Sequence, residues 1–300
     1  MSRFVAIDLD KLPPPNVVEA LSFETMLAEM KADYATRYPQ FTADLESEPM
    51  VKLLEVAAYR ELNVRQRVND AARAVLLATS KGADLDNIGA FYNVERLVVT
   101  PAQPDAFPPV AAVMEDDDRF RRRIQLSLEG FSTAGPEGAY IFHTLTASAA
   151  VKDVAVDSPT PSSITVTILS TTGNGTASDE LKAAVATALA VEDTVPLGDR
   201  VTVEAAGIVE YAINATLKLY PGPDAAVVEA AALAACQDMV SKRHRIGENI
   251  PDSAIKAALH VAGVKEVIVT LPADNAGVAV ADNQAAYCTA INLTVEVVGD

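Results

Sequence analysis

The sequence predicts a multi-domain α+β protein, with an N-terminal all-helical domain followed by two small α/β sandwich modules. Three observations predict this class. With 300 residues, the chain is too long for one small core. Apolar residues recur at three- and four-residue steps through the first hundred residues, which is the period of a helix. From Val151 onward, segments with a period of two alternate with helical segments.

These patterns divide the chain into six segments. We expect an extended arm at 1–21, a helical domain at 22–96, a proline-rich linker at 97–118, a helical hairpin at 119–150, a first α/β module at 151–207 and a second at 208–300. The two modules suggest a duplicated architecture, although their sequences do not align well enough to form an internal repeat.

The arm is set apart by Pro13-Pro14-Pro15, which enforce polyproline geometry. Apolar residues nearly alternate before them, at Phe4, Val5, Ile7 and Leu9. We therefore expect the arm to be mobile in the isolated chain and to add as a strand to a neighbouring subunit.

The helical domain begins at Ser22, which can cap a helix that ends near Pro39. A long helix is expected from about Pro49 to Ser80, with Gly82 as its C-terminal stop and a short helix at 84–92 after it. The apolar stripe of the long helix is too long for this small domain to cover, so part of it should contact a partner. The candidate interface residues are Leu53, Leu54, Ala57, Leu62, Val64 and Val68.

Four prolines between residues 97 and 118 are expected to break any regular element. The acidic run Glu115–Asp118 follows, and it favours a solvated helix N-terminus over a cation site because its side chains point in different directions. A helix at 119–128, a turn at 130–135 and a helix from Pro136 complete this region.

The first module is expected to have the order β-β-α-β, with a strand at 164–169 and a helix at 179–191. Thr176 and Asp179 have the spacing of a capping box for that helix. The second module is expected to have the order β-α-α-β-β, starting with a long strand at 208–220.

The net charge of −17, from 24 basic and 41 acidic residues, argues against nucleic-acid binding and against anionic membranes. The first twenty residues lack the pattern of a signal peptide, and no apolar run has the length of a bilayer span. We therefore expect synthesis in the cytoplasm. Cys236 and Cys288 are expected to be free thiols, because a reducing compartment disfavours a disulfide.

No set of residues in the sequence predicts catalysis, a cofactor or a metal site. The three histidines lie in separate segments, and none has a partner at metal-ligand spacing. The motif Gly173-x-Gly175 lacks the further residues of a phosphate-binding loop, so a plain turn is favoured.

Two basic clusters stand out in this acidic chain. The first comprises Arg119, Arg121, Arg122 and Arg123, and the second comprises Lys242, Arg243, His244 and Arg245. At about 100° per residue, Arg119, Arg122 and Arg123 share one side of their helix. We expect that side, together with Arg243 and Arg245, to meet acidic surface on another subunit. The alternative is a solvated helix face.

Several short segments, in their order and spacing, resemble the baseplate J family of contractile phage tails and related injection machines. The segments are Leu53-Leu54-Glu55, Ala58-Tyr59-Arg60-Glu61, Ala71-Ala72-Arg73, Leu76-Leu77-Ala78, Gly82–Asp86, Tyr92–Arg96, Gly130–His143, Leu217–Pro223 and Ala286-Tyr287-Cys288. The resemblance covers most of the chain. Longer members insert a β-rich domain after the helical region, where this chain has only the proline-rich segment.

The resemblance implies a structural wedge subunit and no enzyme. Its partners would be a second copy of itself, other wedge proteins including tail protein I-like and lysozyme-like subunits, and neighbouring wedges in a ring around the central hub and spike. It would be assembled in the host bacterial cytoplasm and reside in the tail baseplate of a virion or tailocin. Two alternatives remain open from the residues, a tail-associated cell-wall hydrolase and an unrelated cytoplasmic scaffold.

Overall fold

The computed structural model describes residues 7–41, 45–132, 134–191, 195–196, 198–222, 224–270 and 277–298. The chain forms two compact units that divide between Arg96 and Leu97. The first is helical and the second contains the sheets, which confirms the predicted α+β class.

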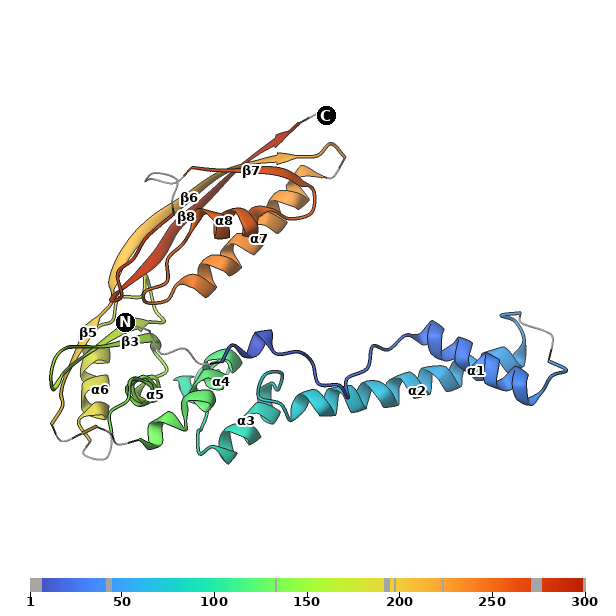
Figure 1. The fold of residues 1–300 in the computed structure, drawn as a ribbon, viewed down its shortest axis with the longest axis horizontal. Coiled ribbons are helices and arrows are strands. Elements are labelled where there is room, and N and C mark those ends of the chain that lie inside the picture. The colour runs from blue at the N-terminus through green and yellow to red at the C-terminus, as the bar shows by residue number, and fades with distance from the viewer. Residues whose placement is uncertain are drawn as a thin grey trace. The chain divides into compact units, whose positions relative to one another are not determined.

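The helical unit contains the 3-10 helix η1 (Leu9–Lys11) and the helices α1 (Phe23–Arg37), α2 (Pro49–Ala74) and α3 (Gly82–Phe91). Helix α1 lies alongside the first half of α2 (Figure 1), and the two bury Met26, Val51 and Ala58. Ser22 caps α1 as predicted, since its hydroxyl accepts a hydrogen bond from the Thr25 amide at 3.3 Å.

Two expectations for this unit are wrong in detail. The long helix ends at Ala74, six residues before the expected position. Gly82 begins α3 with a φ of +52° and does not terminate α2. Leu9 lies in the 3-10 helix η1 of the single chain, while Phe4 and Val5 lie outside the described residues, and addition of the arm to a neighbouring subunit stays a prediction.

The segment before α1 is tied to α2 by one buried amide. Asn69 donates from Nδ2 to the Glu19 carbonyl at 2.9 Å and accepts from the Glu19 amide at 3.0 Å. Arg65 adds an ion pair to the Glu19 carboxylate at 3.1 Å. A buried polar side chain must have its hydrogen bonds satisfied, and this pairing satisfies Asn69 while fixing the course of the extended segment.

The proline-rich segment forms a β-hairpin, so the expectation of no regular element is wrong. Strands β1 (Val98–Thr100) and β2 (Val113–Met114) pair antiparallel, and an isolated bridge joins Gln103 to Val110. None of the four prolines occupies a paired position. Proline has no backbone N–H group, but at these unpaired positions its absence removes no hydrogen bond between the strands.

The central module has helices α4 (Asp117–Leu126) and α5 (Glu137–Ala147), with the 3-10 helix η2 (Glu129–Phe131) between them. Its sheet has the order β3-β4-β5, formed by Val151–Thr160, Ser163–Ser170 and Arg200–Ala205, and α6 (Asp179–Leu189) joins β4 to the parallel strand β5. The predicted β-β-α-β order is confirmed. The cap of α6 is Ser178, whose hydroxyl accepts from the Leu181 amide at 3.2 Å, so the expected Thr176 capping box is wrong.

The C-terminal module has the predicted β-α-α-β-β order. Its elements are β6 (Gly207–Leu219), α7 (Ala225–Arg243), α8 (Asp252–Leu259), β7 (Val264–Thr270) and β8 (Gln284–Val297). Strand β6 is central, antiparallel to β7 and parallel to β8. Both helices cover one face of this sheet (Figure 1), where they bury the alternate residues Ile213, Leu217 and Leu219 of β6.

The central and C-terminal modules share a small core of their own. Its buried members are Leu169, Ala206, Ile246 and Ala285. The Ala206 amide donates to Ile168 at 2.9 Å, and the Gly207 amide donates to Asn283 at 3.0 Å. The chain therefore passes from one sheet to the other with its backbone hydrogen bonds satisfied.

Candidate functional site: surfaces for assembly and a buried arginine cluster

An apolar row runs along the solvent-exposed side of α2. It comprises Leu53, Ala57, Val64, Val68 and Ala71, which we call the α2 stripe. At about 100° per residue these five positions fall within about 60° of the helix circumference. Leu53 is 61% exposed, Val64 65% and Val68 51%. Leu54 and Leu62 are half-buried and lie outside this arc, so only part of the predicted interface set forms one surface.

The stripe is separate from the face that α2 buries within its own unit. Val51, Ala58 and Asn69 form the buried face, about 120° away around the helix. The pairs Leu53 and Val64, and Ala57 and Val68, are each eleven residues apart. An eleven-residue repeat keeps one face of a nearly straight helix turned toward a partner helix. Helix α2 therefore has two apolar faces, and its own unit covers only one.

Two arginines of the first basic cluster, Arg119 and Arg123, point inward and pair with a buried carboxylate. Glu115 is 2% exposed, and its two oxygens pair with Arg119 and with Arg123, the latter at 2.6 Å. Glu115 also binds the first residue of the hairpin segment, because its carboxylate accepts from the Leu97 amide at 3.1 Å and its amide donates to the Leu97 carbonyl at 2.8 Å. One side chain thus joins the base of the hairpin to α4.

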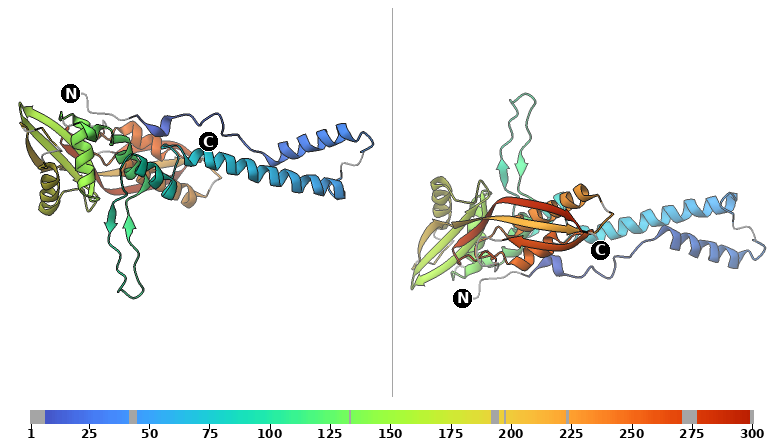
Figure 2. Two further views of the ribbon diagram at one scale, coloured as in Figure 1. Left: turned by 90° about the horizontal axis from the view of Figure 1, so that it is seen from below. Right: turned by 90° about the horizontal axis from the view of Figure 1, so that it is seen from above.

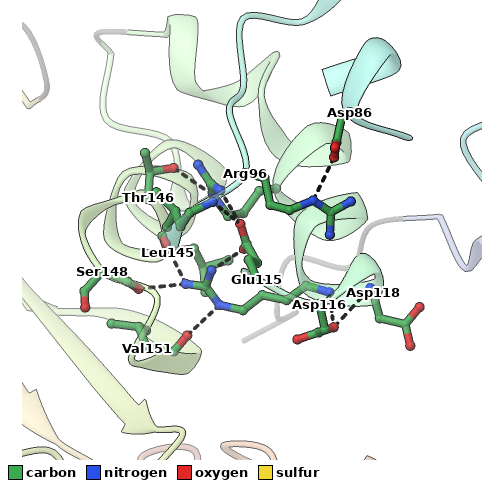
Figure 3. Close-up of polar contacts among 12 residues, drawn as sticks. Asp86, Arg96, Glu115, Asp116, Asp118, Leu145, Thr146, Ser148 and Val151 are labelled. Carbon is green, nitrogen blue, oxygen red and sulfur yellow. Dashed lines mark hydrogen bonds and ion pairs between the residues drawn. The ribbon is translucent and has the colours of Figure 1, made fainter. Parts of the chain in front are cut away.

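Arg119 connects α4 to the end of α5 and the start of β3 through backbone carbonyls of residues that are labelled in Figure 3. Its guanidinium donates to the carbonyls of Leu145 and Ser148, both at 2.7 Å, and to that of Val151 at 2.9 Å. Carbonyls at a helix C-terminus carry partial negative charge, which favours a cation there. Burial nevertheless lowers the pKa of Arg119 from its usual value, and the nearby Glu115 carboxylate opposes that shift.

Arg122 joins a second buried acid that reaches the C-terminal module. Its guanidinium pairs with Asp153 at 2.8 Å, and the other oxygen of Asp153 accepts from the Ile246 amide at 3.0 Å. Asp153 is completely buried, and a buried carboxylate needs a partner for each of its oxygens. The two partners of Asp153 come from different modules.

The expectation that the acidic run Glu115–Asp118 is solvated is therefore only partly correct. Asp118 is exposed, and Asp116 caps α4 by accepting from the amides of Asp118 and Arg119 at 3.1 and 2.9 Å. For Glu115 the expectation is wrong, because two arginines compensate its burial. Contact of Arg119, Arg122 and Arg123 with another subunit stays a prediction, but it would require these internal ion pairs to be exchanged.

The second basic cluster is divided between surface and interior. Arg243 pairs with Glu248 at 2.7 Å and donates to the Asn249 carbonyl, whereas Arg245 is exposed. His244 is buried between them, with its Nδ1 3.1 Å from the Lys152 ammonium. Since an ammonium can only donate, Nδ1 accepts this bond and the imidazole is neutral.

We expect the stability of the protein to fall between about pH 6.5 and pH 4 because of His244. Burial first, and Lys152 second, lower its pKa to about 4 from 6.5. In this window the unfolded chain binds a proton that the folded chain excludes, so the free energy of unfolding decreases as pH falls, by up to about 3 kcal/mol. Urea denaturation of wild type and His244→Gln across this range measures the difference. The exposed His260→Gln variant is the control and should retain the wild-type slope.

The remaining candidate motifs of the sequence form no reaction centre. Gly175 has a φ of +97°, and a Cβ there would lie 2.6 Å from Leu169, so this motif is a tight turn against the module junction. Across the described ranges no cluster of three His, Cys, Asp or Glu side chains could hold a metal ion. In the same part of the chain, no helix is both long and apolar enough to cross a membrane. Cys236 and Cys288 are free.

The sequence did contain a signal for the two buried acids. Asp153 lies between Val151 and Val154 in a strand with a buried face, and Glu115 follows an apolar pair directly before the arginine-rich helix. A charge in such a position needs a charged partner if it is buried. Four nearby arginines therefore indicate internal pairing as readily as they indicate an external surface.

Comparison with known proteins matches the chain in three consecutive parts. A family model described as the baseplate J-like N-terminal domain matches residues 46–103, the baseplate J-like central domain matches 132–205, and the baseplate J-like protein C-terminal domain matches 211–294. Baseplate protein J of Escherichia phage P2 is 51% identical over 290 residues, which cover 94% of this chain and 95% of that protein.

Proposed function

Because the chain belongs to the baseplate J-like protein family, we propose that it is a structural wedge subunit in the baseplate of a contractile tail. In this proposal the α2 stripe joins the chain to a second copy and to other wedge proteins. The C-terminal module contacts neighbouring wedges in a ring around the hub. The main observation in support of this proposal is that the α2 stripe, the second apolar face of α2, is exposed.

The energetics of the stripe support a partner. Burial of apolar surface contributes roughly 25 cal/mol per Å². The side chains of Leu53, Val64 and Val68 are exposed in the isolated unit. Burying them against a partner would therefore add a favourable contribution to the free energy of association. A second helix laid along the stripe would bury them, and the eleven-residue spacing keeps the contact aligned over several turns. Rows of exposed apolar side chains of this kind mark interaction surfaces.

Replacing Leu53 with Asp is expected to abolish assembly of the baseplate while leaving the chain folded. The side chain is exposed in the isolated chain, so a carboxylate there is solvated until a partner would bury it. We expect circular dichroism and melting temperature close to wild type, and no complete baseplates by electron microscopy when the variant is the only source of this subunit.

Asn63→Asp is the matched control, because it adds the same charge on α2 at an exposed position outside the stripe. It should assemble normally. Leu62→Asp is a poorer test, since Leu62 is half-buried and the variant would also disturb folding. Normal baseplates from Leu53→Asp would contradict the proposal for the stripe.

The proposal also assigns the chain no enzymatic activity. Among the described residues, Glu115 and Asp153 are the most deeply buried carboxylates, and each is neutralised by arginine. Such carboxylates are held for structure and lack access to a substrate. Digestion of peptidoglycan by the purified chain would favour the cell-wall hydrolase alternative.

A further inference from the structure

Strand β8 is the outer strand on one side of the C-terminal sheet, with β6 on its inner side (Figure 2). Its pairing with β6 is parallel, and the Val298 amide just beyond its end donates to the Leu219 carbonyl at 3.1 Å. In a parallel ladder, alternate residues turn both backbone groups toward the same neighbour. Leu293 and Val295 therefore turn their N–H and C=O groups away from β6, where no other strand of the described ranges pairs with them. We call residues 290–297 the β8 edge.

The β8 edge lacks the features that protect the other outer strands of the two three-stranded sheets. Outer strands are commonly guarded by charges, prolines or a short length, because unpaired backbone groups attract further strands. Strand β7, at the opposite edge, is seven residues long and includes Lys265 and Glu266. In the central sheet, β3 carries Pro159 near its end, and β5 is only six residues long. The β8 edge has no proline, and Glu296 is its single charge, so its backbone is open to pairing.

The backbone and apolar side chains of the β8 edge are complementary to those of a second copy in the antiparallel direction. Full overlap of residues 290–298 places Thr294 opposite Thr294 of the second copy. Leu293 then lies opposite Val295, and their outward N–H and C=O groups exchange hydrogen bonds. The side chains of both residues are half-buried on the face that α7 and α8 cover. Pairing would therefore also bury apolar surface that a single module leaves exposed.

The polar side chains of the β8 edge match in the same register. Thr294 is exposed on the face that the helices leave open, and two threonines opposite each other form a favourable cross-strand pair. Glu296 lies opposite Asn292 of the second copy. The Asn292 amide donates one N–H to Asn214 at 2.9 Å, so its second N–H can serve the Glu296 carboxylate. The twofold axis repeats this contact, and no like charges lie opposite each other.

A second copy of β8 fits the edge better than a strand from any other segment. A strand added from a different protein or from an N-terminal arm would itself become an outer strand with an unpaired side. Pairing of β8 with β8 covers both edges at once and leaves the guarded β7 strands at the two ends of a continuous sheet, with three strands from each copy.

We propose that two copies of the chain associate by antiparallel pairing of their β8 edges about a twofold axis at Thr294. Such a contact uses the same surface of both copies, as twofold interfaces do. The proposal rests on the function proposed above for its place in the baseplate, because it specifies how the C-terminal module contacts a neighbouring wedge. The pairing itself is a property of the purified chain.

An exchange of charges at the twofold axis tests the pairing. Thr294→Lys and Thr294→Asp each bring two like charges together, so each variant alone should self-associate about 10-fold more weakly than its parent chain. An equimolar mixture of the two variants brings opposite charges together and should restore association to the parent level. Sedimentation velocity measures association of the full chain in the Leu53→Asp background, which removes the contact proposed for the α2 stripe.

Thr270→Lys is the matched control for the charge exchange. Thr270 is exposed and pairs with Asn214 on the same open face, but on β7 at the other edge of the sheet. This variant should associate like its parent chain. Unchanged association of both Thr294 variants would assign self-association to another surface, and weakened association that mixing does not restore would assign the edge to a different segment. Either result overturns the proposal, as does a parent chain that stays monomeric at its highest soluble concentration.

Residue-resolved hydrogen exchange locates the contact on the backbone and separates it from the proposed function. The amides of Leu293 and Val295 should exchange at least about 10-fold more slowly when the chain associates, because their N–H groups then bond to the second copy. The Thr294 amide faces β6 and should be protected at every concentration. Equal exchange at Leu293 in dilute and associated chains would overturn the pairing, whatever the role of the chain in a baseplate. Slowed exchange together with normal baseplates from both Thr294 variants would confirm the pairing and contradict only its use in the baseplate.

Discussion

Glu115→Gln is expected to lower the free energy of unfolding of the sheet-containing unit by about 3–5 kcal/mol, the usual cost of removing one partner from a buried ion pair. The substitution preserves the shape of the side chain but removes the carboxylate charge with which two arginines pair, one of them 2% exposed. It also weakens the acceptor for the Leu97 amide at the base of the hairpin. Urea unfolding followed by circular dichroism measures the loss.

Asp118→Asn is the matched control for Glu115→Gln. Asp118 also pairs with an arginine of α4, Arg121 at 2.6 Å, but its carboxylate is 95% exposed. Water screens and competes for such a pair, so its removal should have little effect on unfolding. If the two variants unfolded at the same urea concentration, the buried cluster would contribute no more than a surface pair, contrary to expectation.

Asp153→Asn is expected to cost about 2–4 kcal/mol and to loosen the C-terminal module from the central module. The two oxygens of Asp153 serve groups from different modules, the Arg122 guanidinium and the Ile246 amide. An asparagine can satisfy only one of them as an acceptor. Hydrogen exchange at the Ile246 amide should accelerate, and unfolding should broaden toward two transitions.

Asp157→Asn provides the control for this variant. Asp157 is on the same strand, β3, but is exposed. It should leave both the exchange rate at Ile246 and the sharpness of unfolding unchanged. Unfolding of Asp153→Asn in one transition, with wild-type exchange at Ile246, would show that other contacts hold the two modules together.

The periodicity of apolar side chains correctly predicted the helices and strands whose position depends mainly on that periodicity. The alternation Ile164–Leu169 became β4, and the amphipathic pattern after Ser178 became α6. Both α/β modules have the predicted order of elements. The hairpin at 98–114 was missed because its prolines argue against strands, and only the register shows that they avoid every paired position.

The direction in which a helix face points could not be predicted from the sequence. The helical period correctly places Arg119, Arg122 and Arg123 on one side of α4, but it does not say whether that side meets solvent, another subunit or the chain's own interior. The answer depends on Glu115 and Asp153, which the fold brings to that side. The same limit applies to α2, where periodicity identified apolar positions but only packing shows that Leu53 is exposed and Leu62 is half-buried.

The passage from β5 to β6 has a mechanical consequence for the transmission of force between the central and C-terminal modules. Only Ala206 separates the two strands, so the backbone from Arg200 to Leu219 consists almost entirely of extended chain. Extended strands are already close to the maximum reach of a polypeptide, at about 3.3 Å per residue, and so contain little slack. A pull between the two modules would therefore be transmitted along the backbone without lengthening it, and would load the ladders β4–β5 and β6–β8 on either side of Ala206.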